Sequence, residues 1–168
     1  MNPVFNVLFV CRQNAARSQM AQTLLQSLGK RRFQAHSAGS EPAAEVHPLT
    51  LETIRNAGLP TTGLHPKGLE IFATAEAPRM DFVFTVCDEL SGCVLPILGR
   101  PVTAHWPIPD PLEARGSHAE KAAVFAEAFK MMRRRIELFV ELPLAGLDRL
   151  TMQRHLDEIG LDKIGAGA

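Results

Sequence analysis

The sequence of 168 residues predicts an α/β fold, with a single doubly wound, mostly parallel sheet of about four strands flanked by helices. Three observations predict it: the short apolar runs, the periodic segments that alternate with them, and the length of the chain. Short runs rich in Val and Phe alternate with longer segments whose apolar residues recur every three or four positions. This alternation is typical of parallel strands joined by crossover helices. The length also fits one ordinary domain that buries its own core.

The expected strands are four apolar runs that are too short to be buried helices. Aromatic and β-branched residues are frequent in them, as in a sheet that is covered on both faces. The four runs are Val4 to Val10, Phe33 to Ala38, Asp81 to Val86 and Val102 to His105.

The expected helices follow from apolar periodicity and from Gly or Pro at the helix ends. The first has Met20, Leu24 and Leu28 on one face and Gly29 as its stop signal. The charged residues of the fourth, including 133–135, are interpreted as a solvated face. The helices are Ala16 to Leu28, Pro48 to Ala57, a short one near Lys67 to Ala73, Ala119 to Val140, and one within LDRLTMQRHLDEIG that ends at Gly160.

Residues 1–141 are expected to form the main domain, and residues 142–168 a helical extension that packs on it or trails from it. Eighteen basic side chains balance eighteen acidic ones, so no net charge favours nucleic acid or an anionic membrane as a partner. The amino-terminal stretch has neither a signal peptide nor a membrane span. We therefore expect a cytoplasmic protein whose partner is a small molecule or another protein.

The stretch VLFVCRQNAARSQMA places a cysteine at the carboxyl end of the first strand, with the spacing C-x5-R-S. A loop of that length can turn its backbone N–H groups inward, and the helix amino terminus adds further donors. Such a cradle binds a tetrahedral oxyanion, and the same donors stabilise a thiolate at Cys11. The expected oxyanion-binding residues are Arg12, Gln13, Asn14, Ala15, Ala16, Arg17 and Ser18.

The chain has three cysteines, Cys11, Cys87 and Cys93. An odd number in a reducing compartment argues against a framework of structural disulfides, and leaves reactive thiols, a metal site or core packing. Neither CxxC nor HxxxH spacing occurs, so no metal site is expected. Cys87 and the proline-rich loop WPIPDPLEARG follow other strands, so they can meet Cys11 at one edge of the sheet.

These motifs, together with SAGSEP, VHPLTLETIRNAG, TVCDEL and AHWPIPDP, make residues 5 to 140 resemble the low-molecular-weight phosphatase superfamily. Within it, RSQMA and the cysteine of TVCD are more similar to the arsenate reductases. The resemblance implies that Cys11 is the nucleophile and that Asp110 protonates the leaving oxygen. It also implies a thiol cascade in which Cys87 attacks Cys11, arsenite leaves, and Cys93 passes the oxidation to thioredoxin or to glutathione and glutaredoxin. No bound cofactor is expected.

Two features depart from the reductase pattern. Gln22 stands where several thioredoxin-linked members have a glutamate that helps bind potassium near Asn14, so no cation is predicted. The spacing between Cys87 and Cys93 is shorter than usual. Six residues of α-helix rise ~9 Å, beyond the ~7 Å limit for the Cα atoms of a disulfide, so residues 88 to 93 must be non-helical or unwind. Otherwise Cys93 is a bystander and a small thiol such as glutathione completes the reaction.

Two other functions stay open. A phosphatase needs only Cys11, Arg17 and Asp110. However, Leu112 follows the Asp-Pro pair and the chain contains no tyrosine, whereas phosphotyrosine phosphatases of this superfamily carry aromatic residues around the pocket. A non-catalytic regulator that binds arsenate or a phosphate-like oxyanion has no use for the cysteine and aspartate.

Overall fold

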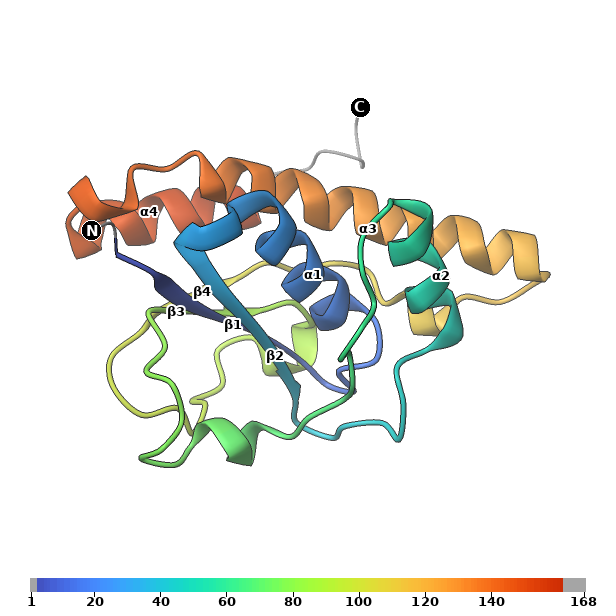
Figure 1. Cartoon of the computed structure of the whole chain (residues 1–168), viewed down its shortest axis with the longest axis horizontal. Coiled ribbons are helices and arrows are strands. Elements are labelled where there is room, and N and C mark those ends of the chain that lie inside the picture. The colour runs from blue at the N-terminus through green and yellow to red at the C-terminus, as the bar shows by residue number, and fades with distance from the viewer. Residues whose placement is uncertain (1–2, 162–168) are drawn as a thin grey trace.

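The computed structural model describes residues 3–161, and within them four parallel strands form one sheet. The strand order is β2-β1-β3-β4 (Figure 1). This confirms the predicted fold class, and each strand begins and ends within one or two residues of its predicted bounds. The strands are β1 (Phe5–Cys11), β2 (Phe33–Gly39), β3 (Phe82–Thr85) and β4 (Val102–His105).

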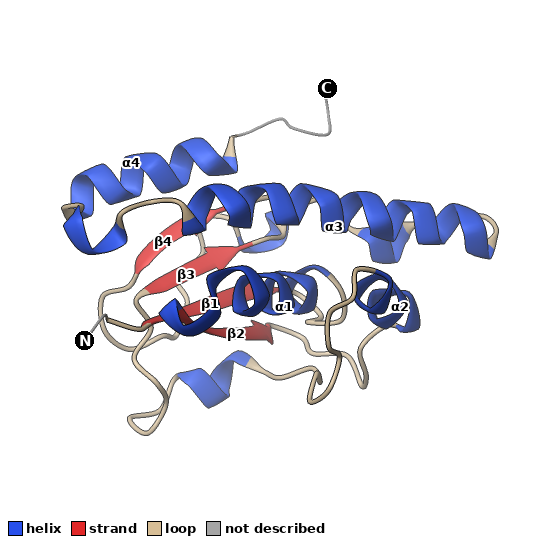
Figure 2. Cartoon of the chain, turned by 45° about the horizontal axis from the view of Figure 1, so that its top comes forward, coloured by secondary structure: helices blue, strands red, loops and turns tan. Residues whose placement is uncertain are grey.

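Four α-helices flank the sheet. Figure 2 shows α1, α3 and α4 on one side of it, while a short 3₁₀ helix and loops cover the other side. That 3₁₀ helix, Leu69–Phe72, corresponds to the short helix expected near Lys67 to Ala73. The α-helices are α1 (Arg17–Gly29), α2 (Pro48–Asn56), α3 (His118–Val140) and α4 (Arg149–Gly160).

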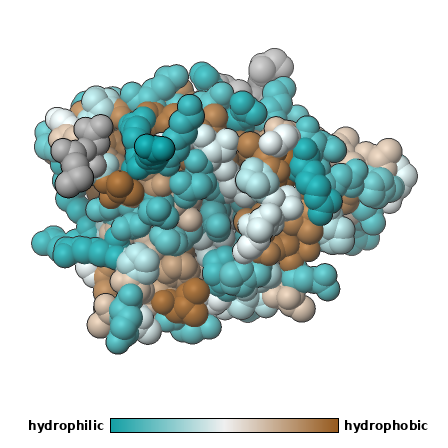
Figure 3. All heavy atoms as spheres, in the orientation of Figure 1, coloured by the Kyte–Doolittle hydropathy of each residue, from teal (hydrophilic) through white to brown (hydrophobic). Residues whose placement is uncertain are grey.

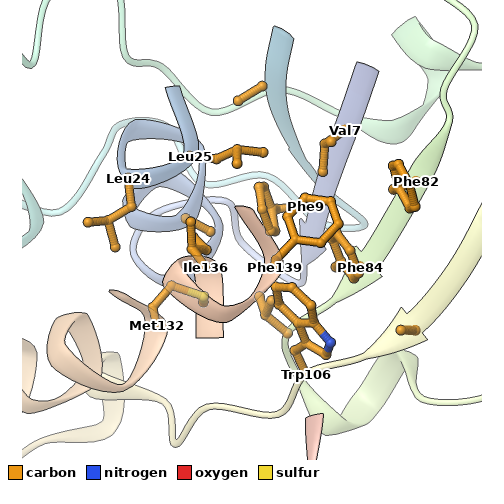
Figure 4. Close-up of a cluster of buried hydrophobic side chains, with 14 of the residues drawn as sticks. Val7, Phe9, Leu24, Leu25, Phe82, Phe84, Trp106, Met132, Ile136 and Phe139 are labelled. Carbon is orange, nitrogen blue, oxygen red and sulfur yellow. The ribbon is translucent and has the colours of Figure 1, made fainter. Parts of the chain in front are cut away.

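The core divides at the sheet, because successive residues of β1 face opposite sides. Val7 and Phe9 pack with the helices, whereas Leu8 and Val10 pack with the 3₁₀ helix side. Figure 4 shows the helix side, where the ring of Trp106 stacks on Phe84 with centroids 3.9 Å apart. The two central strands, β1 and β3, are therefore apolar on both faces, which is why their sequences show little alternation.

Helix α4 is tied to the end of β4 and to the loop after it. The indole Nε1 of Trp106 donates a hydrogen bond to the carbonyl of Leu156 at 3.0 Å. At Gly160 a Cβ atom would lie 2.3 Å from the carbonyl oxygen of His105. A glycine is therefore needed where the end of α4 meets the strand.

One local expectation is wrong. Arg135 does not lie on a solvated face, since its side chain is buried and its Nη1 donates to the carbonyl of Pro107. Helix α1 ends at Gly29, as predicted. The residue with positive φ (49°) is the next one, Lys30, and Gly29 is required by space, since a Cβ there would lie 2.3 Å from the ring of Phe33.

Hydrophilic and hydrophobic side chains are interspersed over the face drawn in Figure 3. Among residues 3–161, no helix combines the length and apolarity needed to cross a bilayer.

Candidate active site

The loop after β1 is held from outside by the segment that follows β2. The carbonyls of residues 11, 12, 13 and 15 accept hydrogen bonds from the backbone N–H groups of residues 40, 41, 43 and 47, at 2.8–3.1 Å. Because a trans peptide is planar, the N–H groups that follow these carbonyls point the opposite way. The N–H groups of residues 12, 13, 14 and 16 therefore point toward the concave side of the loop.

Cys11 lies at the bottom of this loop, at the carboxyl end of β1. Its Sγ accepts a hydrogen bond from the backbone N–H of Asn14 at 3.2 Å and lies 2.9 Å from Oγ of Ser18. Ser18 Oγ also accepts from the side-chain amide of Asn14 at 2.6 Å. A hydroxyl has only one proton, so Ser18 is free to give its own to the sulfur.

Asn14 and Gln19 hold the loop in shape. Asn14 has a φ of 54°, a left-handed conformation that asparagine tolerates better than most residues. Its Oδ1 accepts from the backbone N–H of Lys67, and the Nε2 of Gln19 donates to the carbonyls of Asn14 and His65, each at 2.9 Å. Gln19 Oε1 is buried and has no hydrogen-bond partner among residues 3–161. Buried polar bonds of this kind make the loop rigid.

Arg17 reaches across the sheet edge from the first turn of α1. Its Nη1 donates to the carbonyl of Ile108 at 3.0 Å and to that of Val86 at 3.4 Å, and its Nη2 lies 3.4 Å from Oδ2 of Asp110. Oδ1 of Asp110 accepts from the backbone N–H of Leu112 at 3.0 Å. The guanidinium is thus already oriented, and it brings Asp110 beside the loop.

These groups surround a small cavity of about 120 Å³. Cys11, Arg17 and Asp110 all line it, and Asp110 directly precedes the 3₁₀ turn Pro111–Glu113. The remaining lining residues are Arg12, Gln13, Ala15, Ala16, Glu89, Leu112 and Glu113. A thiol, a guanidinium and a carboxylate thus converge on one cavity. Arg12 also lines the cavity, but its guanidinium is exposed and pairs with the Glu41 carboxylate at 2.8 Å.

Cys87 follows β3, which pairs with β1. The register places Val10 opposite Thr85. The backbone N–H of Val86 then donates a hydrogen bond to the carbonyl of Val10. The Cys87 thiol is buried, and burial, a hydrogen bond to the Glu89 carboxylate and the nearby Cys11 raise its pKa to about 12. At neutral pH Cys87 is therefore a protonated thiol close to Cys11.

Cys93 lies apart from this cavity, on the protein surface. It follows a 3₁₀ turn, Asp88–Leu90, and its Sγ contacts the carbonyl of Glu89 at 3.7 Å. Residues 88–93 thus form no α-helix. Cys93 lines a separate, larger cavity of about 570 Å³ beside β3 and β4.

Two residues at the site, Gln19 and Glu89, were not predicted. They are the glutamine of RSQMA and the glutamate of TVCDEL, but no spacing indicates that Gln19 holds the loop or that Glu89 reaches a thiol. His105 has hydrogen-bond partners on both ring nitrogens, Thr85 and Asp88. Among the described residues, no group of three His, Cys, Asp or Glu side chains is arranged to hold a metal.

The sequence of this chain is similar to those of known proteins. Residues 6–150 match the family model described as low molecular weight phosphotyrosine protein phosphatase. An arsenate reductase of Halalkalibacterium halodurans is 27% identical over 135 residues, covering 80% of this chain and 94% of that protein. A glutaredoxin arsenate reductase of Synechocystis is 30% identical over 109 residues, covering 62% of this chain and 77% of that one.

Among solved structures, the thioredoxin-dependent arsenate reductase of Corynebacterium glutamicum aligns with a TM-score of 0.55 and 29% identity. The alignment covers 82% of this chain and 64% of that one, so this chain matches just under two thirds of its length.

Proposed function

The chain belongs to the low molecular weight phosphotyrosine protein phosphatase family, and from that premise we propose that it is an enzyme that reduces arsenate to arsenite. The observation that carries the proposal is Cys87, a second thiol at the end of the strand that pairs with the strand of Cys11. Hydrolysis of a phosphoester needs only the nucleophile, the arginine and the acid. Reduction needs a second thiol next to the first.

In the first step, arsenate binds to the inward N–H groups of residues 12–18 and to Arg17. The Cys11 thiolate attacks arsenic, so that an S–As bond forms and an As–O bond breaks. Hydroxide is a poor leaving group, and a proton from Asp110 lets it depart as water. The position of Asp110 in the lining of the cavity that contains Cys11 supports this role.

In the second step, Cys87 sulfur attacks Cys11 sulfur. The S–S bond forms as the S–As bond breaks, and its electron pair goes to arsenic, which changes from As(V) to As(III) and leaves as arsenite. The two thiols are oxidised to a disulfide, which balances the two electrons that arsenic gains.

In the third step, Cys93 attacks Cys87, which frees Cys11 and leaves a Cys87–Cys93 disulfide for an external reductant. The turn-rich backbone of residues 88–93 supports this step, because no α-helix has to unwind. The relatives' names include both a glutaredoxin and a thioredoxin dependence, so an external dithiol or glutathione system is the expected reductant.

The test is arsenite production from arsenate, with thioredoxin and its reductase or with glutathione and glutaredoxin. Cys87→Ser should abolish multiple turnover in both systems while oxyanion binding and any slow hydrolysis of an aryl phosphate remain. Cys11→Ser should abolish both reactions. A Cys87→Ser variant that reduces arsenate at the parent rate would mean that this thiol is structural and the mechanism is wrong.

The role of Cys93 has its own test. After one turnover without external reductant, peptide mapping by mass spectrometry should find the Cys87–Cys93 disulfide, because an internal thiol has a high effective concentration. A product with only Cys11–Cys87, or a glutathione adduct when glutathione is supplied, would instead assign the last step to a small thiol.

A further inference from the structure

The second step of the proposed reaction requires Cys87 to act as a nucleophile, although it is a protonated thiol at neutral pH. The thiol is buried beside Cys11, and its pKa is raised to about 12. A thiol is a far weaker nucleophile than a thiolate. Some group must therefore take the proton while the sulfur attacks.

Glu89 is placed to do this. It lies two residues after Cys87 in the turn Asp88–Leu90, and its carboxylate accepts a hydrogen bond from the Cys87 thiol. The same side chain lines the cavity that contains Cys11, Arg17 and Asp110. One carboxylate thus touches the resolving thiol and faces the space where the arsenic adduct would form.

We propose that Glu89 is the general base of the second step and accepts the Cys87 proton as Cys87 attacks Cys11. The inference rests on the proposed arsenate reduction and adds a catalytic residue to it. The transfer is concerted with formation of the S–S bond, because the sulfur loses its hold on the proton as its electron pair enters that bond.

The surroundings of Glu89 keep it ionised and ready to accept a proton. Hydrogen bonds from its own backbone and from Cys87, followed by the positive charges of Arg17 and Arg12, lower the Glu89 pKa. The other ionisable groups that line the cavity with it are Cys11, Asp110 and Glu113. Because a carboxylate with a low pKa is a weak base, the proton moves to Glu89 only as the S–S bond forms, and Glu89 gives it up again easily.

The proton has a destination. When the S–As bond breaks, its electron pair stays on arsenic, and the departing group carries three oxygens. At neutral pH this group takes up three protons and becomes uncharged arsenious acid. One of them is the Cys87 proton, returned by Glu89, and solvent supplies the others. Atoms, charge and electrons therefore balance, and Glu89 regains its carboxylate form for the next cycle.

The experiment measures arsenite release in a single turnover by rapid quench, in a Cys93→Ser background that stops the cascade at the Cys11–Cys87 disulfide. Glu89→Gln keeps the size and hydrogen-bonding ability of the side chain but cannot accept the proton. We expect it to slow arsenite release about a hundredfold or more, while phosphate still binds to the cavity. Glu89→Asp should restore part of the rate.

Asp88→Asn is the matched control. It makes the same charge change one residue away, and its remaining side-chain oxygen can still accept the hydrogen bond from His105. Its release rate should equal that of the Cys93→Ser background.

A second readout separates a base from a residue that merely tunes the thiol. In a Cys11→Ser, Cys93→Ser background Cys87 is the sole thiol, and its thiolate is followed by ultraviolet absorbance against pH. Because the Glu89 carboxylate raises the Cys87 pKa, Glu89→Gln should lower it. More thiolate together with slower release supports the base. Release that is unchanged or faster in Glu89→Gln overturns this inference alone, whereas no arsenite from the Cys93→Ser parent overturns the proposed function itself.

Discussion

Arg17 shows how much one side chain contributes to this site. Its guanidinium is bound to the carbonyls of Val86 and Ile108, which follow β3 and β4, and lies beside Asp110, so it is held in place before any anion arrives. A side chain that is already ordered loses little conformational entropy when it binds a ligand. Arg12, in contrast, lines the same cavity but has a half-exposed side chain that pairs with Glu41.

This difference predicts unequal effects of two substitutions that remove the same charge. Arg17→Ala should weaken phosphate binding by about 1.5–3 kcal/mol, the usual contribution of hydrogen bonds to charged groups. Arg12→Ala should weaken it by less than about 1 kcal/mol, as for exposed ion pairs. Isothermal calorimetry with phosphate measures both, and equal losses would show that charge alone, without the fixed geometry, determines affinity.

At this scale the sequence predicts the residues of the loop but not their bonds. The C-x5-R-S spacing identifies Cys11, Arg17 and Ser18 because all three lie in one short segment. The buried Arg135 escaped prediction because its partner, the carbonyl of Pro107, comes from a distant part of the chain. Glu89 is only two residues from Cys87, but no local pattern says that the turn between them lets the carboxylate reach the thiol.

At the scale of elements, the end of β2 shapes the loop after β1. Gly39 lies directly against it, and a Cβ atom there would be 2.6 Å from the carbonyl oxygen of Arg12 and 3.0 Å from the backbone nitrogen of Asn14. Both neighbours are backbone atoms of the loop, so they cannot move without disturbing its inward N–H groups.

Gly39→Ala should therefore abolish or strongly weaken phosphate binding, even where the protein still folds. Gly146→Ala is the control, because no atom lies within 4 Å of a Cβ there, and it should bind phosphate as the parent does. Circular dichroism checks folding and calorimetry checks binding. Parent-like affinity in a folded Gly39→Ala variant would contradict the assigned role of the close approach.

The strands and long helices were predictable because their signals are local. A run of Val and Phe or a stripe at helical spacing identifies an element without reference to its neighbours. The segment 88–101 gave no such signal. It contains a 3₁₀ turn and irregular loop, and its path depends on contacts with β3, β4 and α4.

At the scale of the whole molecule, α4 completes the core on the helix side of the sheet. Leu156 is fully buried, and its carbonyl accepts the hydrogen bond from Trp106, whose ring stacks on Phe84 in the centre of the core. The amphipathic pattern of the tail predicted a helix there, but it left open whether that helix packs on the sheet or trails from it.

Leu156→Ala should destabilise the folded state by about 2–5 kcal/mol, the cost of an emptied core position. Leu150→Ala makes the same change on the same helix where the side chain is 83% exposed, and its effect should stay within about 0.5 kcal/mol. Urea unfolding followed by the fluorescence of the single tryptophan measures both. Equal effects of the two substitutions would show that α4 contributes little to the core.

The central claim is that this chain carries the electrons for arsenate reduction in its own cysteines. The most direct measurement mixes the fully reduced protein with excess arsenate, without any external reductant, and counts arsenite and remaining thiols. The account predicts about one arsenite per chain and the loss of two of the three thiols, with no arsenite from Cys11→Ser or Cys87→Ser. If the parent chain releases no arsenite and keeps all its thiols, the account is contradicted.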